Sequence, residues 1–92
     1  MQVTISIPTI LRPLTQDQKS IQTNGLNILD AINNIDTQYT GIKDRLINAE
    51  KDEVHQFINI YVNGDDIRFA DNLTTPLNNG DQITILPAVA GG

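Results

Sequence analysis

The most promising feature for chemistry in this sequence lies at its carboxyl end. The chain finishes "ITILPAVAGG", with apolar residues before two glycines. Gly91 and Gly92 carry no Cβ, so their backbone can thread a channel that is too narrow for side chains. If extended, the segment from Pro87 to Gly92 reaches about 20 Å. The reactive group that this segment offers is the α-carboxylate of Gly92.

This carboxylate needs activation before it can react. At neutral pH it is inert unless one oxygen becomes a leaving group, and adenylation by ATP achieves this by forming an acyl-phosphate anhydride. A sulfur nucleophile would then give a thiocarboxylate, whereas an amine would give an amide bond to another protein. The chain has no cysteine, so no internal thiol competes for the activated end. The alternative interpretation is a frayed terminus, because chain ends are often poorly ordered.

Side-chain catalysis has little support in the sequence. His55 is the only histidine, and we interpret it as an exposed structural residue because a zinc site needs several ligands. The acid pairs at 52–53 and 65–66 are adjacent in sequence, so they form neither a facing acid/base couple nor a calcium loop. Gly25, Gly41, Gly64 and Gly80 stand singly and form no phosphate-binding loop. We therefore predict no catalytic residue, no metal site and no cofactor bound by this chain.

Composition indicates one small domain whose core is aliphatic. Of the 92 residues, 39% are hydrophobic and only 4% are aromatic. The formal net charge is −5 and the six basic residues are scattered, which argues against binding to nucleic acid. An acidic surface suits a basic protein partner, although solubility alone also explains it. The sequence shows neither a signal peptide nor a membrane span, so we expect a cytoplasmic protein with no membrane partner.

The hydrophobic periodicity predicts the elements that position this end. Residues 2–7 alternate as a half-buried strand, residues 8–18 form a loop, and residues 19–24 pair back as a second strand. The apolar spacing from 28 to 39 then changes to that of a helix, with Asn27 as N-cap and Asp30 as its capping partner. Gly41 is suited to stop this helix.

The second half of the sequence predicts further strands. We expect one short helical turn at 42–47, a loop at 48–56 and a strand at 57–62. Asn63-Gly64 is a strong hairpin signal that leads to a short strand at 65–69, and residues 82–86 form the last strand. The sequence thus predicts an α+β fold of the β-grasp (ubiquitin-like) type: a mixed four- to five-stranded sheet with one main helix packed on one face. The expected organisation is a β-grasp domain at 1–86 and a flexible tail at 87–92.

Three segments carry a resemblance to a known family. These are "VTISIPTILRP" near the start, "FINIYVNGDDIRF" in the middle and "GDQITILPAVAGG" at the end. With them the chain resembles the MoaD/ThiS-type ubiquitin-like sulfur-carrier proteins, the group of the molybdopterin-synthase small subunit and the thiamine sulfur carrier. Within this group, the segments look most like the carrier used in cysteine biosynthesis.

The resemblance implies a protein co-substrate and not an enzyme. An adenylyltransferase of the ubiquitin-activating type would use ATP to convert the Gly92 carboxylate to an acyl-adenylate, and sulfur transfer would leave a thiocarboxylate. The sulfur acceptor would be a cysteine synthase-like enzyme, with a metallopeptidase that then releases cysteine, or the large subunit of molybdopterin synthase. Conjugation to other proteins through Gly92 stays open as an alternative, as does a passive binding module.

The resemblance also assigns roles to individual residues of the tail. Gly92 matches the activated residue and Gly91 matches its small neighbour. Arg12, Tyr61 and Arg68 lie in matching segments without a fixed role, and we predict that Phe69 belongs to the core. The stretch that partners would recognise consists of Leu86, Pro87, Ala88, Val89, Ala90 and Gly91.

Overall fold

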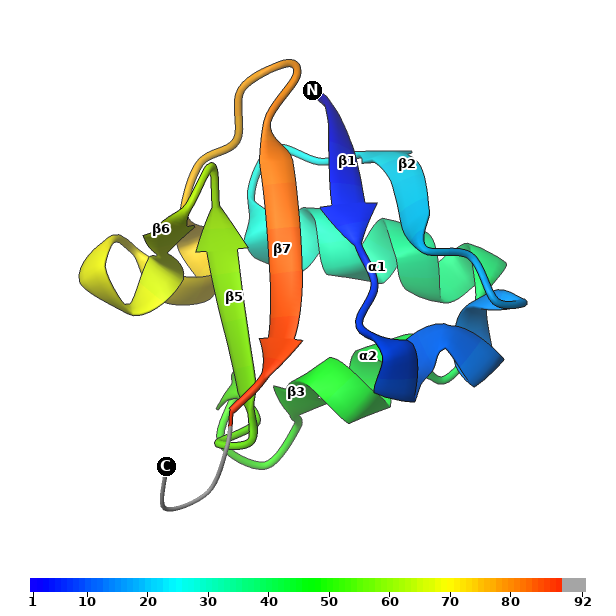
Figure 1. The fold of residues 1–92 in the computed structure, drawn as a ribbon. Coiled ribbons are helices and arrows are strands. Elements are labelled where there is room, and N and C mark those ends of the chain that lie inside the picture. The colour runs from blue at the N-terminus through cyan, green and yellow to red at the C-terminus, as the bar shows by residue number, and fades with distance from the viewer. Residues whose placement is uncertain (89–92) are drawn as a thin grey trace.

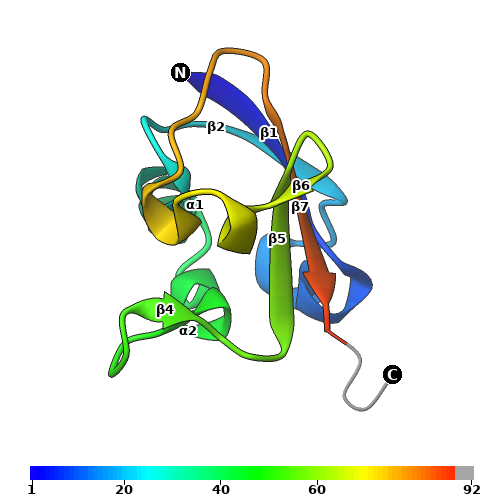
Figure 2. The ribbon, with the colours of Figure 1, turned by 90° about the vertical axis from the view of Figure 1, so that its left-hand side faces the viewer.

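The computed structural model describes residues 1–88 as a twisted sheet with its two α-helices on one face (Figures 1 and 2). Figure 2 shows α1 and α2 on the same side of the sheet. In chain order the elements are β1 (Gln2–Ser6), the 3-10 helix η1 (Thr9–Thr15), β2 (Ser20–Asn24), α1 (Ile28–Gln38), α2 (Ile42–Leu46), β3 (Ile47–Asn48), β4 (Glu53–Val54), β5 (Ile58–Val62), β6 (Asp65–Asp66), the 3-10 helices η2 (Ile67–Phe69) and η3 (Asn72–Thr74), and β7 (Gln82–Pro87).

The main sheet is mixed and has five strands in the order β2-β1-β7-β5-β6. β1 and β2 form an antiparallel hairpin, β1 and β7 run parallel, and β5 pairs antiparallel with both β7 and β6. The last strand of the chain therefore lies in the middle of the sheet. This topology confirms the predicted β-grasp fold, with a five-stranded sheet and α1 as the main helix.

The core lies between the sheet and α1 and consists mainly of isoleucine. Alternate residues of the strands point inward, so Ile5, Ile60 and Ile85 are each at most 2% exposed. The helix adds residues at a spacing of three and four, and Ile28 and Ile35 are also fully covered. Within residues 1–88 the buried hydrophobic residues are thus all aliphatic, and the partly buried Tyr39 packs against them.

The main helix begins at the predicted cap. The Asn27 Oδ1 accepts a hydrogen bond from the Asp30 N–H at 2.8 Å, and the Asp30 carboxylate accepts one from the Leu26 N–H at 2.9 Å. Two N–H groups at the helix start are satisfied by this exchange, and the Asp30 charge also favours the positive end of the helix dipole. The predicted helix at 28–39 and the inward-facing turn of Ile42 and Leu46, each 0% exposed, are confirmed.

The segment predicted as a loop at 8–18 contains a regular element, the 3-10 helix η1. Pro13 lies inside it, because the fixed φ of proline suits a tight helical turn. Leu11 is buried, and the Thr15 hydroxyl donates to the Arg12 carbonyl at 3.2 Å. These contacts stabilise a segment whose prolines and polar residues had indicated a loop.

The predicted loop at 48–56 also contains regular structure, because β3 and β4 form a hairpin with two residues in each strand. Ile47 pairs with Val54 and Asn48 pairs with Glu53. Two residues are too few to show an alternating pattern, so sequence periodicity could not reveal this hairpin.

The strand predicted at 65–69 ends early. The Asn63-Gly64 turn is confirmed, with φ angles of 52° and 90°, but β6 stops at Asp66 and η2 follows. The Asp66 carboxylate accepts the Arg68 N–H at 2.9 Å and so caps η2. This turn directs Phe69 outward, where it is 90% exposed, and the prediction that Phe69 belongs to the core is therefore wrong.

The cap of α1 gives a testable prediction. Replacing Asn27 with alanine removes the acceptor for the Asp30 N–H, and we expect the free energy of unfolding to fall by about 1 kcal/mol. Asn33→Ala, within the same helix, is the matched control and is expected to raise stability by a few tenths of a kcal/mol through higher helix propensity. Urea unfolding of both variants measures this, and equal effects would contradict the capping role.

Candidate functional site

The end of β7 fixes the first residues of the predicted tail, Pro87 and Ala88, which we call its root. Pro87 lies opposite Ile58 of β5, and the Ala88 N–H donates to the Phe57 carbonyl at 2.7 Å. On β7 itself Ile85 is buried, whereas Leu86 points to the other face of the sheet and is 46% exposed. Backbone pairing therefore holds the chain as far as Ala88.

The structure places only part of the predicted recognition stretch. Leu86 and Pro87 belong to β7, and Ala88 continues the pairing with β5. Val89, Ala90, Gly91 and Gly92 lie outside the described residues. The reactive carboxylate of Gly92 stays a prediction, as does the expected division of the chain after residue 86.

An apolar hollow of about 610 Å³ lies beside this root. It is formed where η1, α2 and the first residue of β5 meet the end of β7, at the lower end of the sheet in Figure 1. Ile10 is 71% exposed and Phe57 is 57% exposed at its border. Its lining consists of Ile10, Leu11, Pro13, Leu14, Asp44, Arg45, His55, Phe57, Ile58, Pro87 and Ala88.

Sequence reasoning missed this hollow. Ile10 lies in the segment predicted as a loop, and Phe57 was predicted as one more residue of a strand. The structure begins β5 at Ile58, so Phe57 lies just outside the strand and projects at the surface. The available signal for the hollow was Ile10, an apolar residue between two prolines. Pro87, which also lines the hollow, is about eighty positions away from it in sequence.

Among the polar residues at the hollow, His55 makes a structural contact. His55 is half-buried, and its Nε2 lies 3.0 Å from the Asp44 carbonyl oxygen of α2. The prediction of a structural histidine agrees with this contact, although the ring is less exposed than expected. Within residues 1–88 no three histidine or acidic side chains gather as a metal site would require. Apolar surface and a fixed strand end suit docking of another protein.

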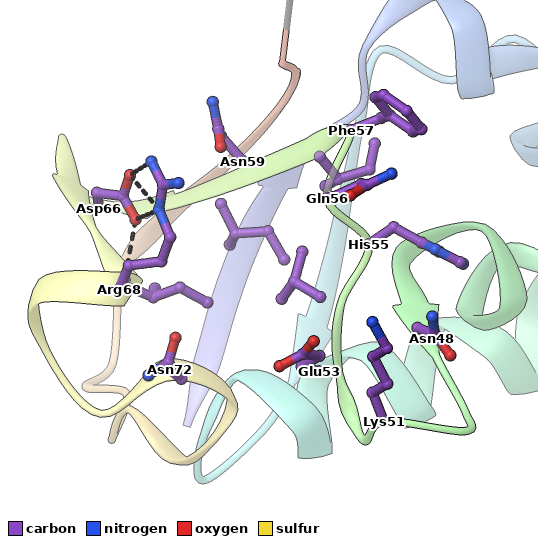
Figure 3. Close-up of a pocket in the computed structure, with 14 residues that line it drawn as sticks. Asn48, Lys51, Glu53, His55, Gln56, Phe57, Asn59, Asp66, Arg68 and Asn72 are labelled. Atoms are coloured by element: carbon purple, nitrogen blue, oxygen red, sulfur yellow. Dashed lines mark hydrogen bonds and ion pairs between the residues drawn. The ribbon is translucent and has the colours of Figure 1, made fainter. Parts of the chain in front are cut away.

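A second hollow, of about 380 Å³, lies along the other side of β5 (Figure 3). Figure 3 shows Asp66 and Arg68 together beside the strand. The Arg68 guanidinium contacts the Asp66 carboxylate with an Nη2–Oδ2 distance of 2.7 Å. These hydrogen bonds lower the pKa of Asp66 and raise the pKa of Arg68, so the pair stays ionised at neutral pH.

The fold and the end of β7 define the class of this protein. It is a ubiquitin-like β-grasp protein whose last strand leads from the middle of the sheet to a terminal segment. Sequence comparison specifies the family. The ThiS family matches residues 5–92, and the chain therefore belongs to the ThiS family.

No helix of the described chain has the length and apolar character to cross a membrane.

Individual relatives agree with this assignment. The sulfur carrier protein CysO of Mycobacterium tuberculosis is 48% identical over 93 residues, with 100% of each chain covered. Its crystal structure matches with a TM-score of 0.91 over 95% of this chain and 99% of that one. A chain of the Amycolatopsis orientalis BexX/CysO complex matches at 48% identity with a TM-score of 0.90, covering 98% and 99%. The small archaeal modifier protein 3 of Haloferax volcanii is 35% identical over 63 residues, 68% of this chain and 66% of that protein.

The two faces of β7 predict losses of stability of different size when their side chains are shortened. Ile85→Ala is expected to lower the free energy of unfolding by about 2–5 kcal/mol, because the side chain is 1% exposed in the core. Leu86→Ala, its neighbour on the outer face, is expected to cost about 1 kcal/mol or less. Chemical denaturation of the two variants tests this, and a larger loss for Leu86→Ala would show that the end of β7 packs differently.

Proposed function

We propose that this protein is a sulfur carrier whose Gly92 carboxylate is adenylated and then converted to a thiocarboxylate. The observation that carries the proposal is the match to CysO over the full length of both chains, together with a strand that fixes the chain up to Ala88. Belonging to the ThiS family supports a small carrier and not a catalyst. The protein is then a co-substrate, and the chemistry is done by its partners.

The proposed reaction uses a backbone group of this chain. A carboxylate oxygen of Gly92 attacks the α-phosphorus of ATP, pyrophosphate leaves, and an acyl-adenylate forms. Hydrosulfide supplied by a sulfur donor then attacks the acyl carbon, the bond to AMP breaks and AMP leaves, and loss of a proton gives the thiocarboxylate. The chain contributes an anchored strand and a terminal Gly-Gly that presents the carbon without side chains. ATP is used by the activating partner, and we propose that no cofactor is held by this chain.

The proposed partners follow from this sequence of steps. An adenylyltransferase of the ubiquitin-activating type activates the carrier, and a synthase accepts its sulfur. We propose a cysteine synthase-like acceptor first, because the CysO relatives match over the whole chain, with a metallopeptidase to release the product. The large subunit of molybdopterin synthase is the second candidate acceptor. That a CysO relative occurs in a complex with BexX supports the expectation that such carriers dock on other proteins.

The mass of the protein tests the proposed modification. Protein purified from cells with an active sulfur-transfer partner is expected to be heavier by the difference between one sulfur and one oxygen atom, and the change is expected to map to the C-terminal peptide. A variant that lacks Gly92 is the control and should stay unmodified. Only the free acid in such material, with the partner shown to be active, would refute the proposal.

Conjugation to other proteins is the second candidate function, and the likeness to small archaeal modifier protein 3 favours it. The tail has no lysine or arginine, so trypsin leaves no short remnant. An Ala90→Arg variant would leave a diglycine remnant on any modified lysine. Such remnants without a thiocarboxylate would favour the modifier, whereas an unchanged cellular role after removal of Gly91 and Gly92 would favour a passive binding module.

The apolar hollow gives a kinetic prediction for the proposed activation step. Phe57 borders the hollow beside Ala88, so we expect Phe57→Ala to raise the KM for the carrier about tenfold in an adenylation assay and to leave kcat nearly unchanged. Phe69→Ala is the matched control, because Phe69 is also exposed but does not border this hollow. Equal KM values for the two variants would show that the activating partner docks elsewhere.

A further inference from the structure

One edge of the main sheet is only partly paired. β5 pairs with β7 along Ile58–Val62, but on its other side β6 pairs only with Tyr61 and Val62. The segment 58–60 therefore has a strand on one side only. The second hollow follows this unpaired edge, and its lining includes Ile58, Asn59 and Ile60 (Figure 3).

The pairing pattern shows which backbone groups face this edge. The Asn63 N–H donates to the Gln82 carbonyl and the Ala88 N–H donates to the Phe57 carbonyl, so the odd-numbered residues of β5 direct their groups toward β7. The even-numbered Ile58 and Ile60 direct theirs the other way. Outside the strand ladders, no hydrogen bond within residues 1–88 uses the Ile58 carbonyl or the Ile60 N–H.

These two groups have the spacing that a parallel strand requires. In a parallel ladder, one residue donates its N–H to one strand residue and accepts from the residue two positions further along. A residue opposite Asn59 would thus bond the Ile58 carbonyl and the Ile60 N–H together. The hollow leaves about 380 Å³ along this edge, between the β3–β4 hairpin on one side and η2 and η3 on the other.

Charge around the edge specifies what kind of strand would fit. Residues 48–72 contain six acids and two basic residues, a net charge of −4 out of −5 for the whole chain. Lys51 with Glu53 and Arg68 with Asp66 line the hollow and balance each other. The remaining acids are exposed and lie in the segments on both sides of the hollow: Glu50 and Asp52 in the turn of the β3–β4 hairpin, Asp65 in β6, and Asp71 between η2 and η3.

We propose that the free edge of β5 binds an extended, lysine- or arginine-bearing segment of a partner protein by strand addition. The backbone of that segment pairs with Ile58 and Ile60, and its basic side chains lie against the four exposed acids. Strand addition of this kind takes affinity from main-chain hydrogen bonds and specificity from side chains. A second copy of this chain is a poor occupant, because it would bring two acidic edges together. The proposal does not depend on the sulfur-carrier function.

A titration with a defined peptide tests the proposal. The probe is a capped nonapeptide of alternating valine and threonine with two lysines at each end, added to the isotope-labelled full chain and followed by NMR. We expect the amides of Ile58–Ile60 to shift most, and exchange of the Ile60 N–H with solvent to slow. Binding is expected to weaken with added salt. The same peptide with glutamates in place of the lysines is expected to bind at least about tenfold more weakly.

Charge-neutralising variants give the matched control. Glu50→Gln with Asp71→Asn removes two acids next to the hollow, and we expect the Kd for the lysine peptide to rise roughly threefold to tenfold. Asp17→Asn with Asp44→Asn removes two exposed acids that lie outside the acidic segment 48–72 and should leave the Kd nearly unchanged. Equal binding of both peptides, equal effects of the two double variants, shifts centred away from β5, or self-association through this edge would each overturn the proposal.

Discussion

The structure depends on the pairing of β7 with two strands at once. Ile83 of β7 lies opposite Ile5 of β1 in parallel pairing, and Ile85 lies opposite Ile60 of β5 in antiparallel pairing. This one strand joins the first and second halves of the chain into a single sheet and buries its inner side chains against α1. Because the register is fixed from both sides, the position of Pro87 and Ala88 is fixed as well. The root of the terminal segment is thus set by the core.

The features that could be predicted from sequence are those with long, regular patterns. The alternation at 2–7 and 82–86 and the helical spacing from Ile28 to Ile35 each follow from burial on one face, so composition and period are sufficient to find them. Asn63-Gly64 was equally readable because its positive φ angles are a local property. The missed elements are short or are held by distant contacts: η1 packs around Leu11, and the β3–β4 hairpin has two residues per strand.

The error at Phe69 shows why side-chain type alone does not place a residue. Phe69 was predicted as the last residue of a strand and as part of the core, but the Asp66 cap turns the chain into η2, which buries Ile67 at 2% exposure and leaves Phe69 at the surface. The candidate site has a similar history. The composition of the tail could be recognised in the sequence. The hollow beside Pro87 and Ala88 could not, because Ile10, Phe57 and Pro87 come together only when the sheet has formed.

The central position of β7 also has a consequence for the order in which the protein is made. β1 is synthesised before the other elements described here, and β7, which completes the sheet beside it, leaves the ribosome after them. Until then β1 has only β2 as a neighbour in the sheet, and β5 has no strand that joins it to the first half of the chain. The sheet closes through the pairing of β1 with β7, which is slow to form because the two strands are far apart in sequence. A chain truncated before β7 would lack both the closed sheet and the segment that follows it.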